Sequence, residues 1–204
     1  RSSDLPAREL LIDMALAGRF TPQMLSCLHP EPGTAERLED LMLSGHLMAQ
    51  PDPPWIALQP QARSFILDQP RSQPDGPRRA RIARWHLQQG QAALALSCGL
   101  PSQDPALLGE IAERLIADQL DLDTFQTLCD ALRSVPEPLA RRDPRICLAM
   151  CFLETMNGCP RSALKWQQWL QACCQEDPCA ENRLRLRCAR MTTAPDDVAL
   201  FHEF

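Results

Sequence analysis

Ten cysteines are the residues of this chain with the widest chemistry, because thiolates bind metals, attack electrophiles and form disulfides. They lie at Cys27, Cys98, Cys129, Cys147, Cys151, Cys159, Cys173, Cys174, Cys179 and Cys188. None belongs to a CxxC pair, and the last five match no zinc-ligand spacing. We interpret the cysteines as thiols that pack as small apolar residues, as Cys147 and Cys151 would on one helix face. A zinc site from the last five, or redox sensing, is the alternative.

The other reactive side chains do not assemble a catalytic motif. The histidines are His29, His46, His86 and His202. No histidine lies beside a serine or cysteine in a nucleophile motif, and the carboxylate pairs Glu39-Asp40 and Asp196-Asp197 are expected on solvated helix faces or ends. No Gly-rich phosphate loop ending in Lys-Ser/Thr occurs in the sequence. We therefore predict a protein that is not an enzyme, with no catalytic residue, no metal site and no cofactor in this chain.

One basic cluster stands out in a chain of net charge −5. It consists of Arg78, Arg79, Arg81 and Arg84, with Arg71 just before it. The same segment carries Ile82, Trp85 and Leu87, which predicts a helix with an apolar side and a solvated arginine side. The functional alternative is a docking stripe for an acidic partner domain or, failing that, for nucleic acid.

Composition indicates what kind of scaffold positions these side chains. The chain has 204 residues, of which 45% are hydrophobic and 5% aromatic, and it contains no tyrosine. Abundant Leu and Ala favour helix, so we predict a mainly α fold. The acidic net charge argues against direct nucleic-acid binding. The sequence has no signal peptide and no apolar run near 18 residues, so we predict a cytoplasmic protein with no membrane segment. The first residue is not Met, so we expect a fragment of a longer protein.

The first 70 residues predict a winged-helix domain. The expected elements are helices at 5–17, 22–28 and 35–44, short strands at 46–50 and 55–59, and a closing helix at 60–68. Leu38, Leu41 and Met42 are expected to point inward from the third helix. Residues 1–70 hold five arginines against nine carboxylates, which would repel a phosphate backbone. We expect this domain to contact protein rather than DNA.

A linker and a series of helix pairs are expected to follow. Residues 71–77 are rich in Pro, Ser, Gln and Gly, and residues 78–204 predict TPR-like αα-hairpins that begin a superhelix. Gly90 is followed five residues later by an alanine, and Gly158 repeats the pattern 68 residues on, which is twice the TPR period. The clearest hairpin spans 146–170. Its first helix is expected to bury Ile146, Ala149, Met150, Leu153 and Met156.

The order of these parts resembles a known family. The segment from Arg81 to Ala95 reads RIARWHLQQGQAALA. The later run contains Leu128–Leu132, Val135-Pro136, Pro138-Leu139, Arg142, Pro144, Cys147-Leu148, Gly158 and Ala163. Both resemble the helical region of MalT-type large ATP-dependent LuxR-family transcription regulators, which are signal-transduction ATPases. The resemblance covers about residues 5–175.

The resemblance implies a place in a larger machine. Such regulators join a nucleotide-binding domain, a winged helix, a superhelical sensor of an inducer and a C-terminal DNA-binding domain. This chain would be the middle, with the ATPase and DNA-binding domains of the same chain, and a small-molecule inducer or regulatory protein, as partners. ATP and Mg would bind elsewhere in the full-length protein. Gln59 and Pro60 stand where the family carries a nucleotide-contacting histidine pair, so a scaffold without nucleotide control is the alternative.

Overall fold

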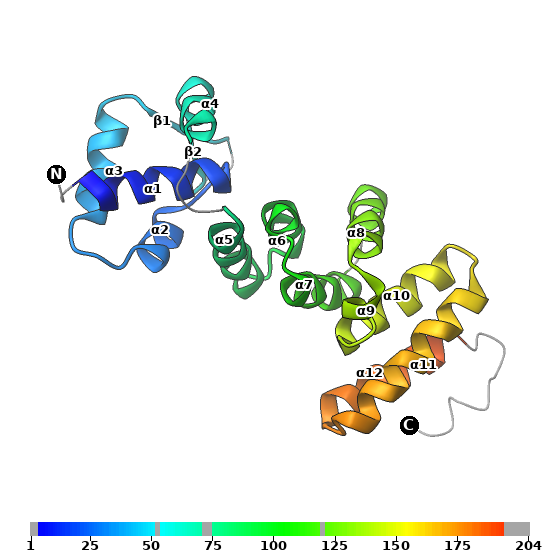
Figure 1. The fold of residues 1–204 in the computed structure, drawn as a ribbon. Coiled ribbons are helices and arrows are strands. Elements are labelled where there is room, and N and C mark those ends of the chain that lie inside the picture. Colours follow the sequence, from blue (N-terminus) through cyan, green and yellow to red (C-terminus); the bar gives the residue numbers. More distant parts are fainter. Residues whose placement is uncertain (1–3, 52–53, 71–74, 119–120, 194–204) are drawn as a thin grey trace. The chain divides into compact units, whose positions relative to one another are not determined.

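The protein is mainly helical, as composition predicts (Figure 1). The computed structural model describes residues 4–51, 54–70, 75–118 and 121–193. The chain forms two compact units, Arg1–Ser102 and Gln103–Phe204. Because the division falls at Ser102, the helices immediately after the expected linker belong to the first unit. The domain limits 1–70 and 78–204 remain a prediction from sequence.

The first unit contains six helices and a hairpin among its described residues. They are α1 (Asp4–Ala17), α2 (Pro22–Leu28), α3 (Thr34–Leu43), β1 (Leu47–Ala49), β2 (Ile56–Leu58), α4 (Pro60–Asp68), α5 (Gly76–Gln88) and α6 (Ala92–Gly99), followed by a 3₁₀ turn, Leu100–Ser102. Thr21 caps α2 by accepting a hydrogen bond from the Met24 amide at 3.1 Å, and Pro22 opens the helix. Residues 71–74 of the expected linker lie outside the described residues.

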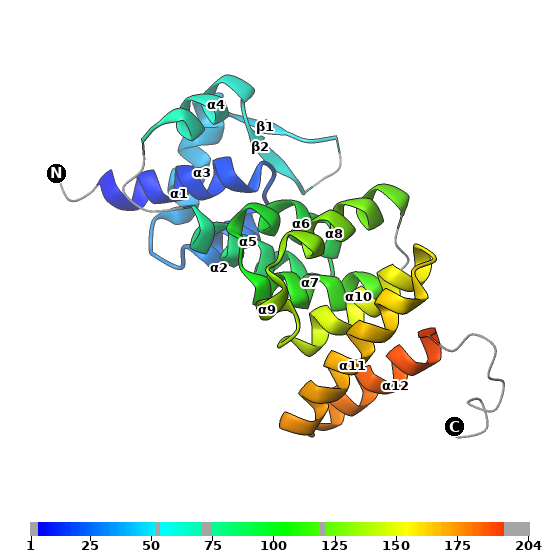
Figure 2. The ribbon, with the colours of Figure 1, turned by 45° about the vertical axis from the view of Figure 1, so that its right-hand side comes forward.

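The hairpin is extended by a third short segment. β1 and β2 pair antiparallel with Leu47 opposite Leu58, and Figure 2 shows the two strands side by side. On the other edge of β2, the Phe20 amide donates to the Ile56 carbonyl at 2.8 Å, and the Ile56 amide donates back at 2.9 Å. The connection between α1 and α2 therefore joins the hairpin to the helices, and Phe20 is fully buried there.

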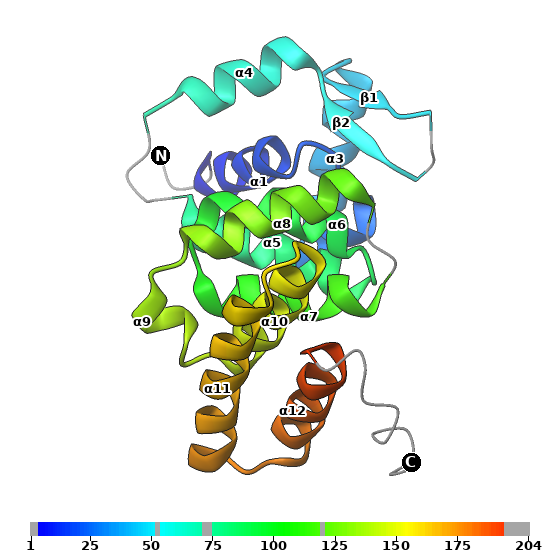
Figure 3. The same ribbon diagram turned by 90° about the vertical axis from the view of Figure 1, so that its right-hand side faces the viewer.

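The second unit is entirely helical in its described residues. Its helices are α7 (Pro105–Ala117), α8 (Leu122–Ser134), α9 (Glu137–Ala140), α10 (Pro144–Met156), α11 (Pro160–Glu176) and α12 (Ala180–Thr193). Asp104, Asp121 and Asp143 cap α7, α8 and α10 by accepting backbone N–H bonds. α10 and α11 form the expected αα-hairpin, and α12 packs on both, antiparallel to α11 in Figure 3.

The turns at Gly90 and Gly158 have the same geometry. Gly90 has φ +73° and Gly158 has φ +70°, a left-handed conformation that glycine adopts without strain. In each turn the glycine amide donates a hydrogen bond to the backbone carbonyl three residues earlier, that of Leu87 or Thr155, both at 3.0 Å. The amide of the next residue donates to the carbonyl five residues earlier, that of His86 at 2.9 Å or Glu154 at 2.8 Å. The repeated glycine in the sequence thus marks a repeated helix-to-helix turn.

The prediction that Met42 and Met156 point inward is wrong. Met42 is 52% exposed and Met156 is 64% exposed. The α-helix advances about 100° per residue, so two four-residue steps from the buried Thr34 carry Met42 roughly 80° around α3 and off its inner stripe. Met156 lies only about 20° around α10 from the buried Ala149, so its exposure reflects its position as the last residue of the helix. Leu41 is half-buried, whereas Leu38, Ile146, Ala149, Met150 and Leu153 are buried as predicted.

Candidate functional site

The arginine cluster is divided by the structure into two pairs. Arg78 and Arg81 both bond to Asp13, and Arg78 also bonds to Glu9. These acidic residues lie on α1 and the arginines on α5, within the first unit. Arg79 is half-buried and Arg84 is exposed on the same helix. The expected apolar side is present, because Ile82 and Trp85 are buried and Leu87 is half-buried.

Asp13 is the hub of this polar cluster. Its side chain is fully buried, and its carboxylate accepts from Arg78 Nη1 at 3.1 Å, from Arg81 and, at 3.0 Å, from His29 Nε2. A buried carboxylate loses its hydration and needs such donors to remain charged. Burial, followed by the nearby Arg81 charge, lowers the pKa of Arg78. The cluster joins α1, α5 and the end of α2, which is a structural role for half of the expected docking stripe.

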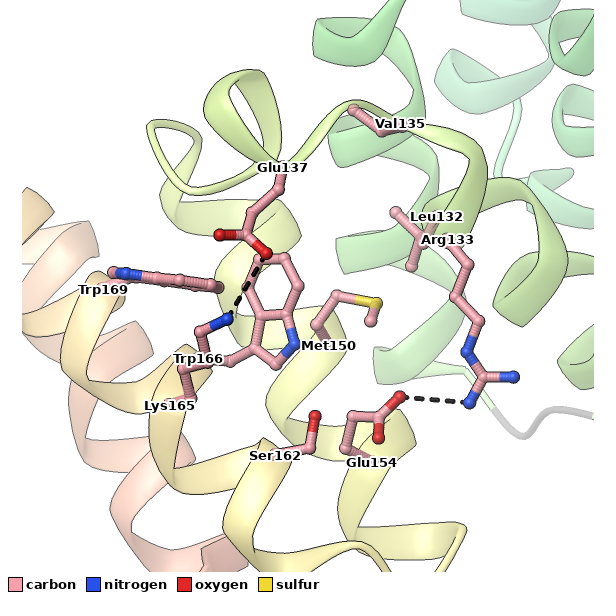
Figure 4. Close-up of a pocket in the computed structure, with 10 residues that line it drawn as sticks. All are labelled: Leu132, Arg133, Val135, Glu137, Met150, Glu154, Ser162, Lys165, Trp166 and Trp169. Carbon is pink, nitrogen blue, oxygen red and sulfur yellow. Dashed lines mark hydrogen bonds and ion pairs between the residues drawn. The ribbon is translucent and has the colours of Figure 1, made fainter.

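A pocket of about 310 Å³ lies in the second unit (Figure 4). Its walls come from α8, the segment after it, α9, α10 and α11. The lining residues are Leu132, Arg133, Val135, Glu137, Met150, Glu154, Ser162, Lys165, Trp166 and Trp169. Figure 4 shows the Trp166 indole reaching from α11 toward Glu137, with Met150 beside it. The helix α11 therefore supplies both aromatic rings.

Paired charges flank the aromatic rings of the pocket. Arg133 donates to Glu154 at 3.1 Å, and this hydrogen bond raises the pKa of Arg133. At the other side, Lys165 donates to Glu137 at 3.3 Å and lies 4.5 Å from the Trp169 ring centroid. The Trp166 and Trp169 rings pack edge to face, with their centroids 4.6 Å apart. Lys165, the sole lysine of the sequence, thus holds a cation–π contact at the pocket.

The pocket combines aromatic and charged side chains. Its volume of about 310 Å³ is at the lower end of small-molecule sites, and half of its lining residues are charged or polar, which is more than such sites usually have. No histidine or cysteine is among its ten lining residues, so Ser162 has no base of that kind beside it. The carboxylates of Glu137 and Glu154 are already engaged by cations. The arrangement can hold a polar group against the indole rings.

Four buried cysteines lie on α10 and α11, and all but Cys173 belong to the apolar core that also includes Ala189 of α12. Cys147, Cys151, Cys173 and Cys174 are all buried, which confirms packing for these four residues. Burial raises the pKa of each thiol, to about 12 for Cys151, so the reactive thiolate is scarce near neutral pH. Cys159 and Cys188 are exposed and Cys179 is half-buried. Within residues 4–51, 54–70, 75–118 and 121–193, no three His, Cys, Asp or Glu side chains are grouped to hold a metal.

The histidines lie in separate environments. His29 belongs to the Asp13 cluster, and His46 is exposed. His86 is buried; its Nδ1 lies 2.9 Å from Gln91 Oε1, and its ring stacks on Trp55 at 5.9 Å. Burial lowers the pKa of His86, and the Arg19 charge adds to this shift. His202, like Asp196 and Asp197, lies outside the described residues.

Sequence reasoning missed two features of this arrangement. The Asp13–Arg78 bond joins residues 65 positions apart, and no local pattern signals such a pair. The pocket likewise takes Arg133 and Lys165 from different helices. Its only local signal was the Trp166 and Trp169 spacing of three residues, which places two indoles on adjacent turns of one face.

Comparisons with known proteins found no matching family model, no curated relative and no similar solved structure. In the part of the chain that the structure describes, no helix has the length and apolar character needed to cross a membrane.

Proposed function

We propose that this chain is the middle part of a MalT-type LuxR-family transcription regulator, acting in the cytoplasm as an interdomain relay and binding module. Its first part would be the winged helix and its second the start of a TPR-like sensor superhelix. ATP and promoter DNA would bind to other domains of the same protein. The proposal is carried by one observation, the order of secondary structure along the chain: three helices, a hairpin, a fourth helix and then helix pairs.

Hydrogen bonding in the first unit supports the winged-helix part. In a winged helix, the segment between the first two helices pairs with the second strand of the wing. Here Phe20 lies between α1 and α2 and exchanges two hydrogen bonds with Ile56 of β2. The exposed face of α3 carries Glu36, Glu39 and Asp40. This face suits a cationic or mixed protein surface rather than DNA phosphates.

The repeated glycine turns support the TPR-like part. The α5–α6 and α10–α11 pairs share the same left-handed glycine and the same two capping bonds. Five residues after each glycine, Ala95 and Ala163 are fully buried. A small residue at this point lets two helices approach closely. Recurring pairs of this kind are the unit from which helical superhelices are built.

The pocket supports a binding role for the second part. An inducer or a segment of a regulatory protein held there would contact α8, α9, α10 and α11 together, because all four line it. A ligand shifts a conformational balance only through its different affinities for the two states. A group that bridges four helices can distinguish two arrangements of them. The relay would therefore operate by population shift, with no bond made or broken.

A protein-contacting scaffold without nucleotide control is the second candidate. It is favoured by Gln59, whose side-chain amide donates to the Gly45 carbonyl within the hairpin. Gln59 stands where the family carries a nucleotide-contacting histidine, and here its side chain is held by this exposed hydrogen bond. The affinity of such a scaffold for its protein partner would be the same in the presence of ATP, in the presence of ADP and without nucleotide.

The coding sequence on either side is the first test. The regulator proposal requires a phosphate-loop domain before this region and a helix-turn-helix domain after it. Fluorescence anisotropy with labelled duplex DNA is the second test. At low salt the chain should leave the DNA free, because the acidic surface of residues 1–70 opposes counterion release. Missing flanking domains, or steep salt-dependent DNA binding by the chain itself, would remove the basis of the proposal.

A further inference from the structure

The outer face of α12 carries a row of three arginines. Arg183, Arg187 and Arg190 are exposed, and no described residue forms an ion pair with any of them. Their spacing of four and three residues places them on one side of the helix, over about 10 Å of its length. Arg185 differs, because it turns inward and bonds to Glu113 at 2.5 and 2.9 Å. Among residues 4–51, 54–70, 75–118 and 121–193, nothing occupies the three outer arginines, so they can bind a partner.

Apolar side chains lie beside this arginine row. Leu184 is 59% exposed and Met191 is 40% exposed, and both sit on the same outer half of α12. The opposite side of the helix buries Asn182 and Ala189 against the unit. Exposed Leu and Met add nothing to the binding of phosphates, whereas they complement an apolar side chain on another protein. The face thus fits an acidic helix that also exposes leucine or methionine.

The chain contains such a helix. On α3, Glu36, Glu39 and Asp40 are exposed, and no described residue forms an ion pair with them. The same face carries Leu43, 87% exposed, with Met42 at its edge. Glu36 and Leu43 are seven residues apart, so this face is also about 10 Å long. Both faces therefore combine three like charges with exposed apolar side chains, chiefly Leu43 on α3 and Leu184 and Met191 on α12, and their charges are opposite.

We propose that the α12 face of one copy of this chain binds the α3 face of a second copy, in a head-to-tail contact. The contact uses different surfaces on the two copies, so it can continue into longer assemblies or close into a ring. Exposed ion pairs are weakened by salt, and their steering effect falls as salt rises. Association is expected to be reversible, concentration-dependent and salt-sensitive.

Sedimentation velocity of the 204-residue chain, at rising concentration and at about 50 mM and 0.5 M salt, tests the contact. The α12 variant R183E/R187E/R190E and the α3 variant E36R/E39R/D40R should each weaken self-association by on the order of tenfold or more. Mixing the two variants, or combining all six changes in one chain, should restore it. Circular dichroism would verify that each variant remains helical.

A matched control separates the contact from overall charge. Arg141, Arg142 and Arg161 are also exposed in the second unit, and R141E/R142E/R161E changes the net charge by the same amount as the α12 variant. This control should associate like the unchanged chain. A chain that is monomeric under all conditions, or association that neither reversal weakens, would overturn the proposal. Binding of a monomeric chain to anionic phosphatidylserine vesicles, lost in the α12 variant, would assign the face to a membrane and would equally overturn it.

Discussion

Replacing Asp13 with alanine should destabilise the first unit more than any other single change at a charged residue there. Asp13 is fully buried and accepts from His29, Arg78 and Arg81. Without the carboxylate, the Arg78 side chain, which is 14% exposed, retains Glu9, whereas the buried His29 ring loses this partner. Breaking a buried ion pair by removing one partner costs about 3–5 kcal/mol. Because Arg78 retains its ion pair with Glu9, we expect the free energy of unfolding to fall by roughly 3 kcal/mol, the low end of this range.

Urea denaturation followed by far-UV circular dichroism and tryptophan fluorescence measures this loss. Trp55 and Trp85 report on the first unit, and Trp166 and Trp169 report on the second. In a thermal melt, a loss of about 3 kcal/mol in a unit of this size corresponds to a fall in Tm of roughly 12–24 °C. Asp13→Asn, which keeps an acceptor and removes the charge, should lie between alanine and the unchanged chain.

Asp40→Ala is the matched control, because Asp40 is exposed and belongs to the same unit. Surface changes of this kind usually alter stability by under about 0.5 kcal/mol. If Asp13→Ala were to cost no more than Asp40→Ala, the buried cluster would not be what joins α1, α2 and α5. The structural role given to Arg78 and Arg81 would then be wrong.

Three further predictions concern the pH response, the thiols and the pocket. Because burial, followed by Arg19, lowers the pKa of His86, the unfolded chain takes up this proton at a higher pH than the folded chain. Stability should therefore be complete above about pH 6.5 and fall as pH decreases, by at most about 1.4 kcal/mol per pH unit, and His86→Gln should remove this part of the slope in denaturation curves. In a thiol-labelling time course, the exposed thiols of Cys27, Cys159 and Cys188 should react first, and the buried thiols should react only on unfolding. If Cys151 were labelled as fast as these exposed thiols, its burial and its raised pKa would be contradicted. Arg133→Ala leaves the buried Glu154 without its cation and should cost about 1–3 kcal/mol by urea denaturation, whereas Arg142→Ala, at an exposed site, should be close to neutral.

Local signals were sufficient to predict the start of α2 and the turns that follow α5 and α10. Thr21-Pro22, Gly90 and Gly158 act within a few residues of themselves, through a cap or a left-handed turn, so their effect can be read from the sequence. The inward placement of the two methionines failed for different reasons. Met42 lies off the inner stripe of α3, an angle that the three-and-four spacing of apolar residues does not resolve. Met156 is the last residue of α10 and lies beyond the buried Leu153.

The polar contacts could not be predicted because they depend on tertiary approach. Arg78 and Arg79 are adjacent in sequence, yet only Arg78 meets Asp13 and Glu9. The helical pattern assigned all four arginines to one solvated stripe. What decides their roles is the packing of α1 against α5, which sequence periodicity does not contain. Docking by Arg79 and Arg84 remains a prediction from sequence.

The most direct test of the account is whether this chain binds a neighbouring domain of its own protein. Isothermal titration of the 204-residue chain with the separately produced phosphate-loop domain would measure that binding. We predict saturable binding that R79E/R84E weakens and that R141E/R142E leaves unchanged. A reading frame that encodes no such domain, or a titration without heat of binding at any nucleotide state, would contradict the proposal that the chain is an interdomain relay.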